Sequence, residues 1–219
     1  MQIVAPKSFS ELQTSALLLA GRTLGDIAGR LNLTVPASLN HAKGWVGQLL
    51  EMALGANAGN LDQPDFTDLG IELKTLPVSS LGQPYESTYI CTAPIPITDP
   101  SFEESRVWRK MASMLWIPIE AAPHIPIPQR RIGTPIFWSP CLEIKAQLKQ
   151  DWEELTNLIN FGHFDKLGAH HGHYLQIRPK AAHSKTFVQV INHDGIRIST
   201  VPKGFYLRAT LTQEIVKQR

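Results

Sequence analysis

The chain has 219 residues, of which 43% are hydrophobic and 18% are charged. This composition is typical of a globular protein that buries one sizeable core, or one core with two lobes. No apolar run approaches the ~18–20 residues of a membrane span, and the first residues lack the basic-then-apolar pattern of a signal peptide. Two cysteines, Cys91 and Cys141, are too few and too scattered for a disulfide framework or a zinc site. We therefore expect a reduced, cytoplasmic protein.

The net charge of +2 hides an asymmetry along the chain. From Arg178 to the end there are eight Lys and Arg residues against two acids, whereas the remainder has 13 basic and 17 acidic residues. A basic C-terminal region suits a polyanion such as DNA, although a basic segment can also be a solvated face.

Three helices are predicted before the first strand. Residues Ser8 to Arg22 and Thr23 to Leu31 form a small helical lobe without evident chemistry. The third helix, Lys43 to Gly55, has a broad apolar side and a stripe on which Gly44, Gly47 and Glu51 follow one another. The glycines suggest close approach of a backbone or a DNA strand. Glu51 either reaches a metal pocket or is an ordinary exposed acid.

The segment GIELKTLPV predicts a short strand. Because side chains two apart on a strand share a face, Ile71 and Leu73 would point to the core, while Glu72 and Lys74 project together on the other side. The alternative is a surface hairpin with a solvated Glu-Lys pair.

A second acid, Asp65, precedes Glu72 across a stretch with turn character, and a hairpin or bent loop could return its carboxylate beside the strand. Two carboxylates, water and a phosphate oxygen form the pocket that Mg²⁺ needs for phosphodiester hydrolysis. Lys74 could orient the nucleophile or stabilise the developing charge. Asp62 and Asp68 are close in sequence, so the pattern by itself does not fix its first acid.

The middle of the chain alternates strands and helices. The expected strands are Thr88–Ala93, Met114–Ile119 and Thr134–Trp138, and the expected helices are Phe102–Ser113 and Glu143–Phe161. The first of these helices carries Arg106, Arg109 and Lys110, which could contact phosphate or solvate a helix face.

The C-terminal third contains the remaining expected elements. Three histidines, His170, His171 and His173, are turn residues or, less simply, a transition-metal site. Residues Tyr174 to Ile177 predict a strand that Pro179 stops, which would leave Arg178 and Lys180 on a loop. Residues Ile198 to Leu207 predict a hairpin-like segment around Pro202 and Gly204, with Phe205 and Tyr206 on opposite faces. A terminal helix closes the chain.

These pieces together resemble the MutH family, the strand-discriminating endonucleases of methyl-directed DNA mismatch repair. They occur in the family's order and cover most of the chain from Lys43 onward. The matching segments are KGWVGQLLEMALGA, PDFTDLGIELKTLPV, RKMASMLWIPIE, DWEELTNLI, YLQIRPKAA and PKGFYL.

The resemblance implies a restriction-endonuclease-like α/β fold, in which helices flank a mixed central β-sheet and two lobes form a DNA-binding cleft. Residues 1–219 would form a single endonuclease domain with an N-terminal catalytic lobe and a basic C-terminal DNA-recognition lobe. By motif, the catalytic trio would be Asp65, Glu72 and Lys74, with Asp65 and Glu72 as metal ligands. The further active-site positions match Glu51 and Lys110. The residues that match DNA-contacting positions are Lys43, Arg178, Lys180 and Tyr206.

The resemblance further implies a Mg²⁺-dependent nick 5′ of the G in the unmethylated strand of a hemimethylated GATC site. Mn²⁺ or Ca²⁺ suits the same oxygen ligands. MutL, loaded by MutS at a mismatch, would activate a monomeric enzyme that cuts one strand of double-stranded DNA. Tyr206 is the candidate for rejecting the N6-methyl group of adenine. The alternatives are a restriction-type endonuclease that cuts both strands at GATC and a DNA-binding module without catalysis.

Overall fold

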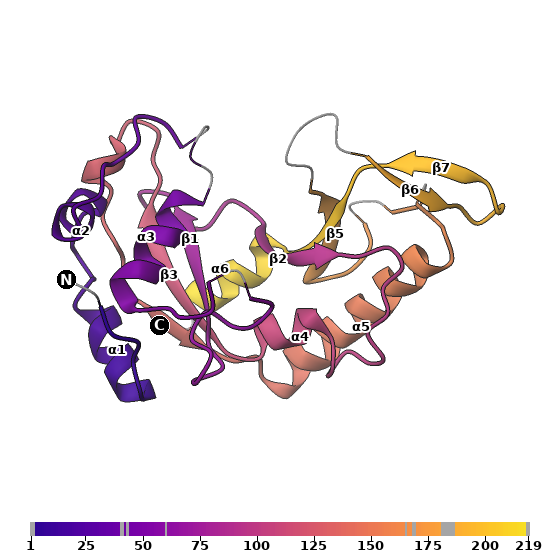
Figure 1. Ribbon diagram of the computed structural model, residues 1–219, viewed down its shortest axis with the longest axis horizontal. Helices are drawn as coiled ribbons and strands as arrows, with labels where there is room; N and C mark the ends of the chain where they lie inside the picture. The colour runs from indigo at the N-terminus through magenta and orange to yellow at the C-terminus, as the bar shows by residue number, and fades with distance from the viewer. Residues whose placement is uncertain are drawn as a thin grey trace. The chain divides into compact units, whose positions relative to one another are not determined.

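The computed structural model describes residues 3–39, 42, 44–59, 61–164, 166–167, 170–180 and 187–217. The chain forms two compact units that are interleaved in sequence (Figure 1). The first unit contains Met1–Tyr85, Ala112–Ser139 and Ile215–Arg219, and the second contains Glu86–Met111 and Pro140–Glu214. None of the helices in the described part of the chain has the length and apolar character needed to cross a membrane.

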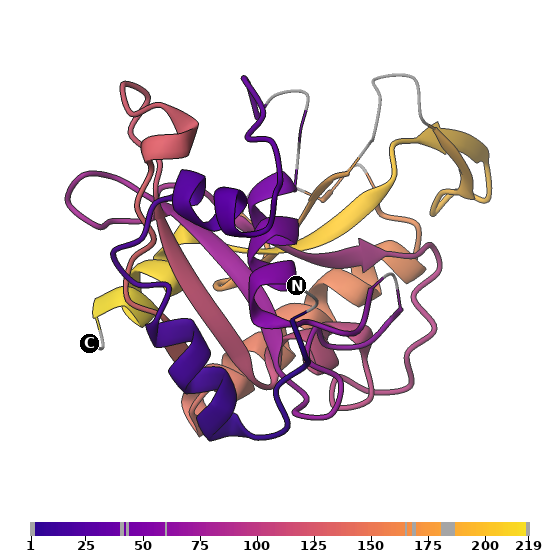
Figure 2. The same cartoon turned by 60° about the vertical axis from the view of Figure 1, so that its left-hand side comes forward.

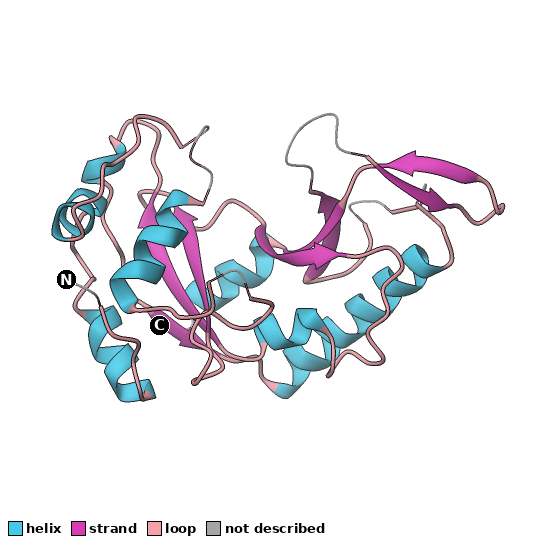
Figure 3. Cartoon of the chain, in the orientation of Figure 1, coloured by secondary structure: helices cyan, strands magenta, loops and turns pink. Residues whose placement is uncertain are grey.

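The first unit is built on a mixed sheet of three strands in the order β1-β3-β4 (Figure 3). The strands are β1 (Glu72–Val78), β3 (Met114–Glu120) and β4 (Ile136–Trp138). Strand β1 runs parallel to β3, and β4 runs antiparallel to β3. Most of β3 is fully buried, as expected of the central strand of a sheet that is covered on both faces. The mixed sheet confirms the expected α/β class.

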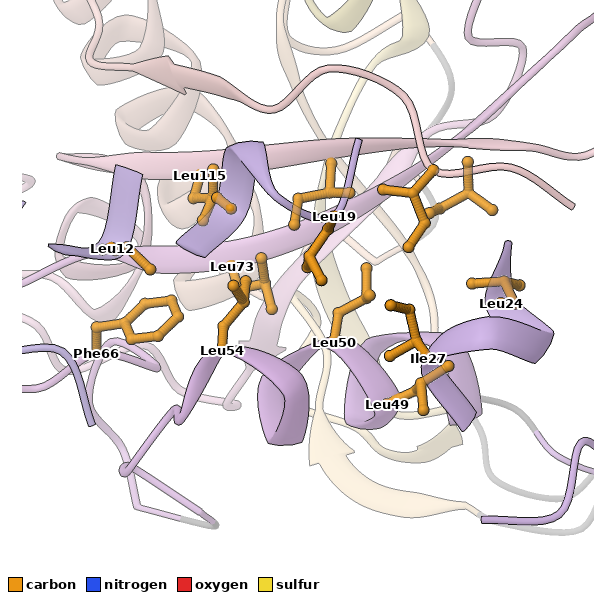
Figure 4. Packing of buried hydrophobic residues seen from close by; sticks show 14 of the residues in the cluster. Leu12, Leu19, Leu24, Ile27, Leu49, Leu50, Leu54, Phe66, Leu73 and Leu115 are labelled. Carbon is orange, nitrogen blue, oxygen red and sulfur yellow. The ribbon is translucent and has the colours of Figure 1, made fainter. Parts of the chain in front are cut away.

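Helices supply the apolar partners of this sheet. They are α1 (Phe9–Leu17), α2 (Leu24–Arg30), α3 (Trp45–Leu54) and the short 3₁₀ helix η1 (Ile127–Gln129). Helix α3 packs against β1, and both views of the chain show it lying across that strand (Figures 1 and 2). In the core, Leu54 of α3 lies beside Leu73 of β1, and Leu50 of the same helix belongs to the same cluster (Figure 4). Full burial of each such leucine contributes about 1.5–3 kcal/mol, so this packing holds β1 firmly.

Two helices of the first unit differ from the sequence-based bounds at their ends. Helix α1 stops at Leu17, well before Arg22, and the chain then turns through Gly21, which has a φ of 77°. Its N-cap is Ser8, whose side chain accepts a hydrogen bond from the Glu11 backbone N–H. Helix α3 begins after Gly44, whose φ of 87° lies outside the helical region, so Gly47 is the only glycine within the helix.

The second unit contains an antiparallel sheet in the order β2-β8-β5. Its elements are β2 (Thr88–Ala93), α4 (Arg106–Met111), α5 (Leu142–Asn160), β5 (Leu175–Pro179), β6 (Val188–Ile191), β7 (Arg197–Thr200) and β8 (Lys203–Leu207). The last helix, α6 (Ala209–Lys217), is divided by the boundary between the units. Helix α4 packs against β2, and α5 packs against β5.

Two sequence-based predictions about this sheet are wrong. Pro179 does not stop β5 before Arg178: the strand continues, and Arg178 pairs with Gly204 and Pro179 with Lys203. Proline is tolerated because β5 is an edge strand of this sheet, where an N–H is not needed on the outer side. The segment around Pro202 is also not a hairpin, since β7 pairs with β6 while β8 joins β2 and β5.

Candidate active site and nucleic-acid interface

Strand β1 carries the acid and the base of the candidate site on one face. Ile71, just before the strand, and Leu73 are 3% and 4% exposed and belong to the core. On the opposite face, Lys74 Nζ lies 2.5 Å from Glu72 Oε1. Glu72 is only 2% exposed, so the pair is not the solvated surface pair that the sequence allowed. A buried carboxylate requires compensating charge or hydrogen bonds, and the Lys74 ammonium supplies both.

A tight turn brings Asp65 back to this strand. The backbones of Phe66 and Ile71 pair with each other, and Gly70 between them has a φ of 64°, which favours glycine. As a result, Asp65 Oδ2 accepts a hydrogen bond of 2.8 Å from the backbone N–H of Leu73. The carboxylate therefore lies beside the strand directly after Glu72.

The two rival acids of this segment lie elsewhere. Asp62 and Asp68 are both exposed, whereas Asp65 is half-buried. Among the contacts described for these three acids, the hydrogen bond to β1 is the one that Asp65 accepts from the Leu73 backbone N–H. The geometry thus supports the first acid that the PDF motif selected.

Glu51 lies on α3, the helix that packs against β1, and it is half-buried. A Cβ placed on Gly47 would lie 3.7 Å from Glu51 Oε1, so the carboxylate folds back over that glycine. Across the described residues, no three His, Cys, Asp or Glu side chains gather closely enough to hold a metal ion. Glu51 is therefore not assembled with Asp65 and Glu72 into a closed three-acid site.

Two further lysines were expected, one at the active site and one at the DNA. Lys110 lies in the last turn of α4, in the second unit, beside Arg109. Lys43 lies outside the described residues. The structure therefore brings together Asp65, Glu72 and Lys74 within one unit, with Glu51 on the adjoining helix.

The second unit has a face on which aromatic and basic side chains alternate. Tyr89 of β2 pairs with Tyr206 of β8, and their ring centroids are 5.3 Å apart. The Arg178 guanidinium lies 5.6 Å from the Tyr206 ring centroid and donates a hydrogen bond to Ser87 Oγ. Lys180 Nζ lies 4.0 Å from the Tyr89 centroid. Such cation–π contacts hold basic groups on a surface without neutralising their charge.

Tyr89 is a member of this face that the sequence did not reveal. A bulge between Tyr89 and Cys91 breaks the alternation of β2, so that the consecutive residues Ile90 and Cys91 are both buried. On β8, a Cβ on Gly204 would lie 3.0 Å from Tyr89 Cε2 and 3.3 Å from Tyr206 Cε2. Glycine at this position leaves room for both rings. In the sequence, the glycine of the PKGFYL segment was the one sign of this close packing.

Burial influences the titration of this face. It raises the pKa of Tyr206 above the ordinary value of 10.0, while Arg178 acts in the opposite direction. Burial also raises the pKa of Tyr89 and lowers the pKa of Lys203. Both tyrosines therefore keep their phenolic protons at neutral pH and can act as hydrogen-bond donors.

The histidines near β5 serve the turn that precedes it. His171 Nδ1 lies 2.8 Å from Glu154 Oε1 of α5, and its Nε2 lies 2.7 Å from the Lys166 carbonyl oxygen. The backbone N–H of Gly172 also donates to Glu154. These contacts attach the turn to α5 and agree with the interpretation of the histidines as turn residues.

The basic character of the C-terminal region is local. By sequence, the first unit holds nine Lys and Arg and eight Asp and Glu, and the second holds twelve and eleven, so each has a net charge of +1. The acids of α5 and its surroundings offset the basic strands within the second unit. A DNA contact would accordingly depend on the face that carries Arg178 and Lys180, and not on the charge of a whole lobe.

A short mixed sheet whose first strand carries Glu-x-Lys, with an aspartate returned beside it, defines a restriction-endonuclease-like α/β protein. Comparisons with known proteins agree with this class. The sequence model of the family described as "DNA mismatch repair enzyme MutH" matches residues 54–151.

Similar proteins extend the match to nearly the whole chain. The protein named DNA mismatch repair protein MutH from Shewanella sp. (strain MR-4) is 46% identical over 217 residues, covering 99% of this chain and 97% of its own. The protein of that name from Yersinia pestis (strain Pestoides F) is 46% identical over 208 residues, covering 94% and 91%. The chain belongs to the MutH family, which confirms the resemblance seen in the sequence, and it is therefore an enzyme.

Proposed function

We propose that this protein is a Mg²⁺-dependent endonuclease of DNA mismatch repair. It nicks the unmethylated strand of a hemimethylated GATC site on the 5′ side of the G. The observation that carries the proposal is the arrangement at β1 in a chain of the MutH family: the Lys74 ammonium contacts the Glu72 carboxylate, and the Asp65 carboxylate accepts the backbone N–H of the intervening Leu73.

The acid on β1 and the acid bound beside it fit a hard divalent cation. Carboxylate oxygens from Asp65 and Glu72 are the ligands that Mg²⁺ prefers, and Mg²⁺ commonly takes one or two carboxylates and keeps several waters. The absence of a third gathered acid in the described residues is compatible with such a site. When bound, the ion lowers the pKa of a coordinated water and offsets negative charge on the phosphoryl group. Mn²⁺ or Ca²⁺ suits the same oxygens.

The side chains around the acids orient the reaction. Lys74, held by Glu72, presents its ammonium where a phosphate oxygen or the attacking water can accept a hydrogen bond. Glu51 adds negative charge on the adjoining helix, and Lys110 is the second lysine that the family resemblance assigns. Because Ile71 and Leu73 are fixed in the core, the carboxylates keep their direction without reorganisation during the reaction.

The second unit supplies DNA recognition. Arg178 and Lys180 contact phosphates, as Lys43 does near the cut, and these contacts set the register of the protein on the duplex. The neutral hydroxyl of Tyr206 meets the adenine N6 amino group, which is exposed in the major groove. A methyl group on N6 would crowd the ring and remove a hydrogen bond, so the methylated strand is not cut.

The role in repair requires a controlled, single-strand cut. One active centre per monomer cuts one strand, whereas a dimer would risk a double-strand break. MutL, after loading by MutS at a mismatch, activates the enzyme in the cytoplasm.

A supercoiled plasmid with GATC sites tests the reaction. With Mg²⁺, the wild-type protein should convert it to open circles, and Glu72→Ala should remain folded and bind DNA but not nick it. Rapid conversion to linear DNA would indicate a restriction-type enzyme, and binding without any cleavage would indicate a binding module. Cleavage retained in Glu72→Ala would contradict the assigned site.

A further inference from the structure

The aromatic and basic face of the second unit has a row of side chains that crosses three strands. Register places Tyr89 of β2 opposite Tyr206 of β8, and Tyr206 opposite Gln176 of β5. Directly opposed residues share a face and lie side by side. On β5, the preceding residue Leu175 is fully buried, which puts the Gln176 side chain on the same outer face as Tyr206.

Gln176 differs from its neighbours in having an uncommitted polar group. Its amide forms no hydrogen bond to any side chain or backbone group in the part of the chain that the structure describes, although the residue is half-buried. By contrast, Arg178 on the same face donates to Ser87 and stacks against Tyr206. A side-chain amide has two N–H donors and a carbonyl acceptor, so Gln176 presents both kinds of group beside the Tyr206 ring.

We propose that Gln176 is a base-reading residue that recognises an adenine of the target site in the major groove. Adenine presents N7 as an acceptor and N6 as a donor there, and the amide of glutamine matches both in a bidentate pair. Tyr206 and Gln176 belong to the adjacent strands β8 and β5, so both side chains are presented from the same face of the sheet. This inference rests on the proposed function and adds a specificity residue to it.

The chemistry of the row favours adenine over the other bases. An arginine would favour guanine or a phosphate, and an acidic side chain would favour the amino group of cytosine. Tyr206 carries one hydroxyl, which cannot reach two positions of a base edge in the manner of an amide. Gln176 therefore supplies the two-point contact that separates adenine from the remaining bases.

The test combines a protein variant with an altered base. Wild-type protein and Gln176→Ala are compared on a GATC duplex and on duplexes in which one adenine, first of one strand and then of the other, is 7-deazaadenine, which lacks the N7 acceptor. Nicking is measured as kcat/KM, and binding is measured in parallel by fluorescence anisotropy. The matched control is Gln189→Ala, because Gln189 is a strand glutamine of the same unit whose amide donates to Ser199.

A good bidentate pair discriminates by about 1–3 kcal/mol, or roughly 5- to 150-fold. Gln176→Ala should lower kcat/KM on the ordinary duplex by this factor, and 7-deazaadenine at one of the two positions should reduce the wild type similarly. Gln176→Ala on the duplex with 7-deazaadenine at that position should lower kcat/KM no further than either change alone. Gln189→Ala should behave as the wild type.

Two results would overturn the proposal. Additive losses, or an equal loss of Gln176→Ala on every duplex, would mean that Gln176 supports the sheet and does not read a base. No loss would remove it from recognition altogether. Failure of the wild-type protein to nick would count against the proposed function instead, while the anisotropy data would still decide whether Gln176 reads the adenine.

Discussion

Asp65 combines a structural and a chemical role, and two substitutions separate them. Its Oδ2 accepts the Leu73 N–H at 2.8 Å. Asp65→Asn keeps an acceptor oxygen, so we expect unfolding free energy within about 1 kcal/mol of the wild type, whereas Asp65→Ala should lose about 1–3 kcal/mol. Both should lose nicking, because each removes a carboxylate. Urea denaturation and a plasmid assay check this, and an active Asp65→Asn would contradict a role as metal ligand.

The pair of Lys74 and Glu72 should be strongly coupled. Removing one partner of a buried ion pair leaves an uncompensated charge, at a cost of about 3–5 kcal/mol. Lys74→Met should approach the upper end, since it leaves the carboxylate of Glu72, which is 2% exposed, whereas Glu72→Gln leaves Lys74, which is 19% exposed, and should approach the lower end. The double variant Lys74→Met/Glu72→Gln should recover much of that loss. A double variant as unstable as the sum of the two single variants, in urea denaturation without added metal, would show that the pair is not coupled.

Tyr206 gives a prediction for alkaline pH. Because burial raises its pKa above 10.0, the folded protein holds this proton when the unfolded chain has lost it. The contribution to stability is therefore intact below pH 10.0 and is lost as the pH rises through the higher folded value. Arg178 opposes the shift, so Arg178→Ala should raise the pKa further. The absorbance of tyrosinate, after subtraction of the Tyr206→Phe signal, measures the pKa of Tyr206. A lower pKa in Arg178→Ala would be inconsistent with the contact between Arg178 and the Tyr206 ring.

At the scale of elements, strand β5 depends on one buried carboxylate of α5. Asp151 is 1% exposed and accepts hydrogen bonds from three successive backbone N–H groups, those of His173, Tyr174 and Leu175, at 2.6–2.8 Å. We expect Asp151→Asn to cost about 3 kcal/mol, since hydrogen bonds to charged groups contribute about 1.5–3 kcal/mol each.

Hydrogen exchange provides the measurement for Asp151→Asn. The amides of the turn before β5 should lose protection, and those of β1 should not. The matched control is Glu153→Gln, an exposed acid of the same helix, which should stay within about 0.5 kcal/mol of the wild type. Unchanged protection at Leu175 would show that β5 is held by the sheet alone.

Local sequence patterns predicted most helices and strands, but they did not predict which strands pair in the same sheet. The alternation around Glu72 gave β1 and its two faces, since one side had to be buried. Nothing local to Ile198–Leu207 shows that β7 and β8 join different sheets, because that depends on partners distant in the sequence. The bulge in β2 likewise concealed Tyr89, since it breaks the two-residue period on which strand reading depends.

On the scale of the whole molecule, motifs predicted the candidate site better than charge did. Asp65, Glu72 and Lys74 form a local group because a turn and a strand suffice to join them. The basic C-terminal third suggested a basic lobe, but the second unit has a net charge of +1, since residues before Arg178 contribute most of its acids. Sequence order does not reveal such interleaving of two units.

The central claim is strand-selective cleavage, and one measurement tests it most directly. A duplex with a single GATC site, labelled separately on each strand, is prepared unmethylated, hemimethylated in both senses and fully methylated. It is incubated with Mg²⁺, with and without MutL and ATP. We predict a cut 5′ of the G in unmethylated strands only, increased by MutL. Equal cutting of methylated and unmethylated strands would contradict methyl-directed repair, and no cutting of any duplex would contradict the assignment as an endonuclease.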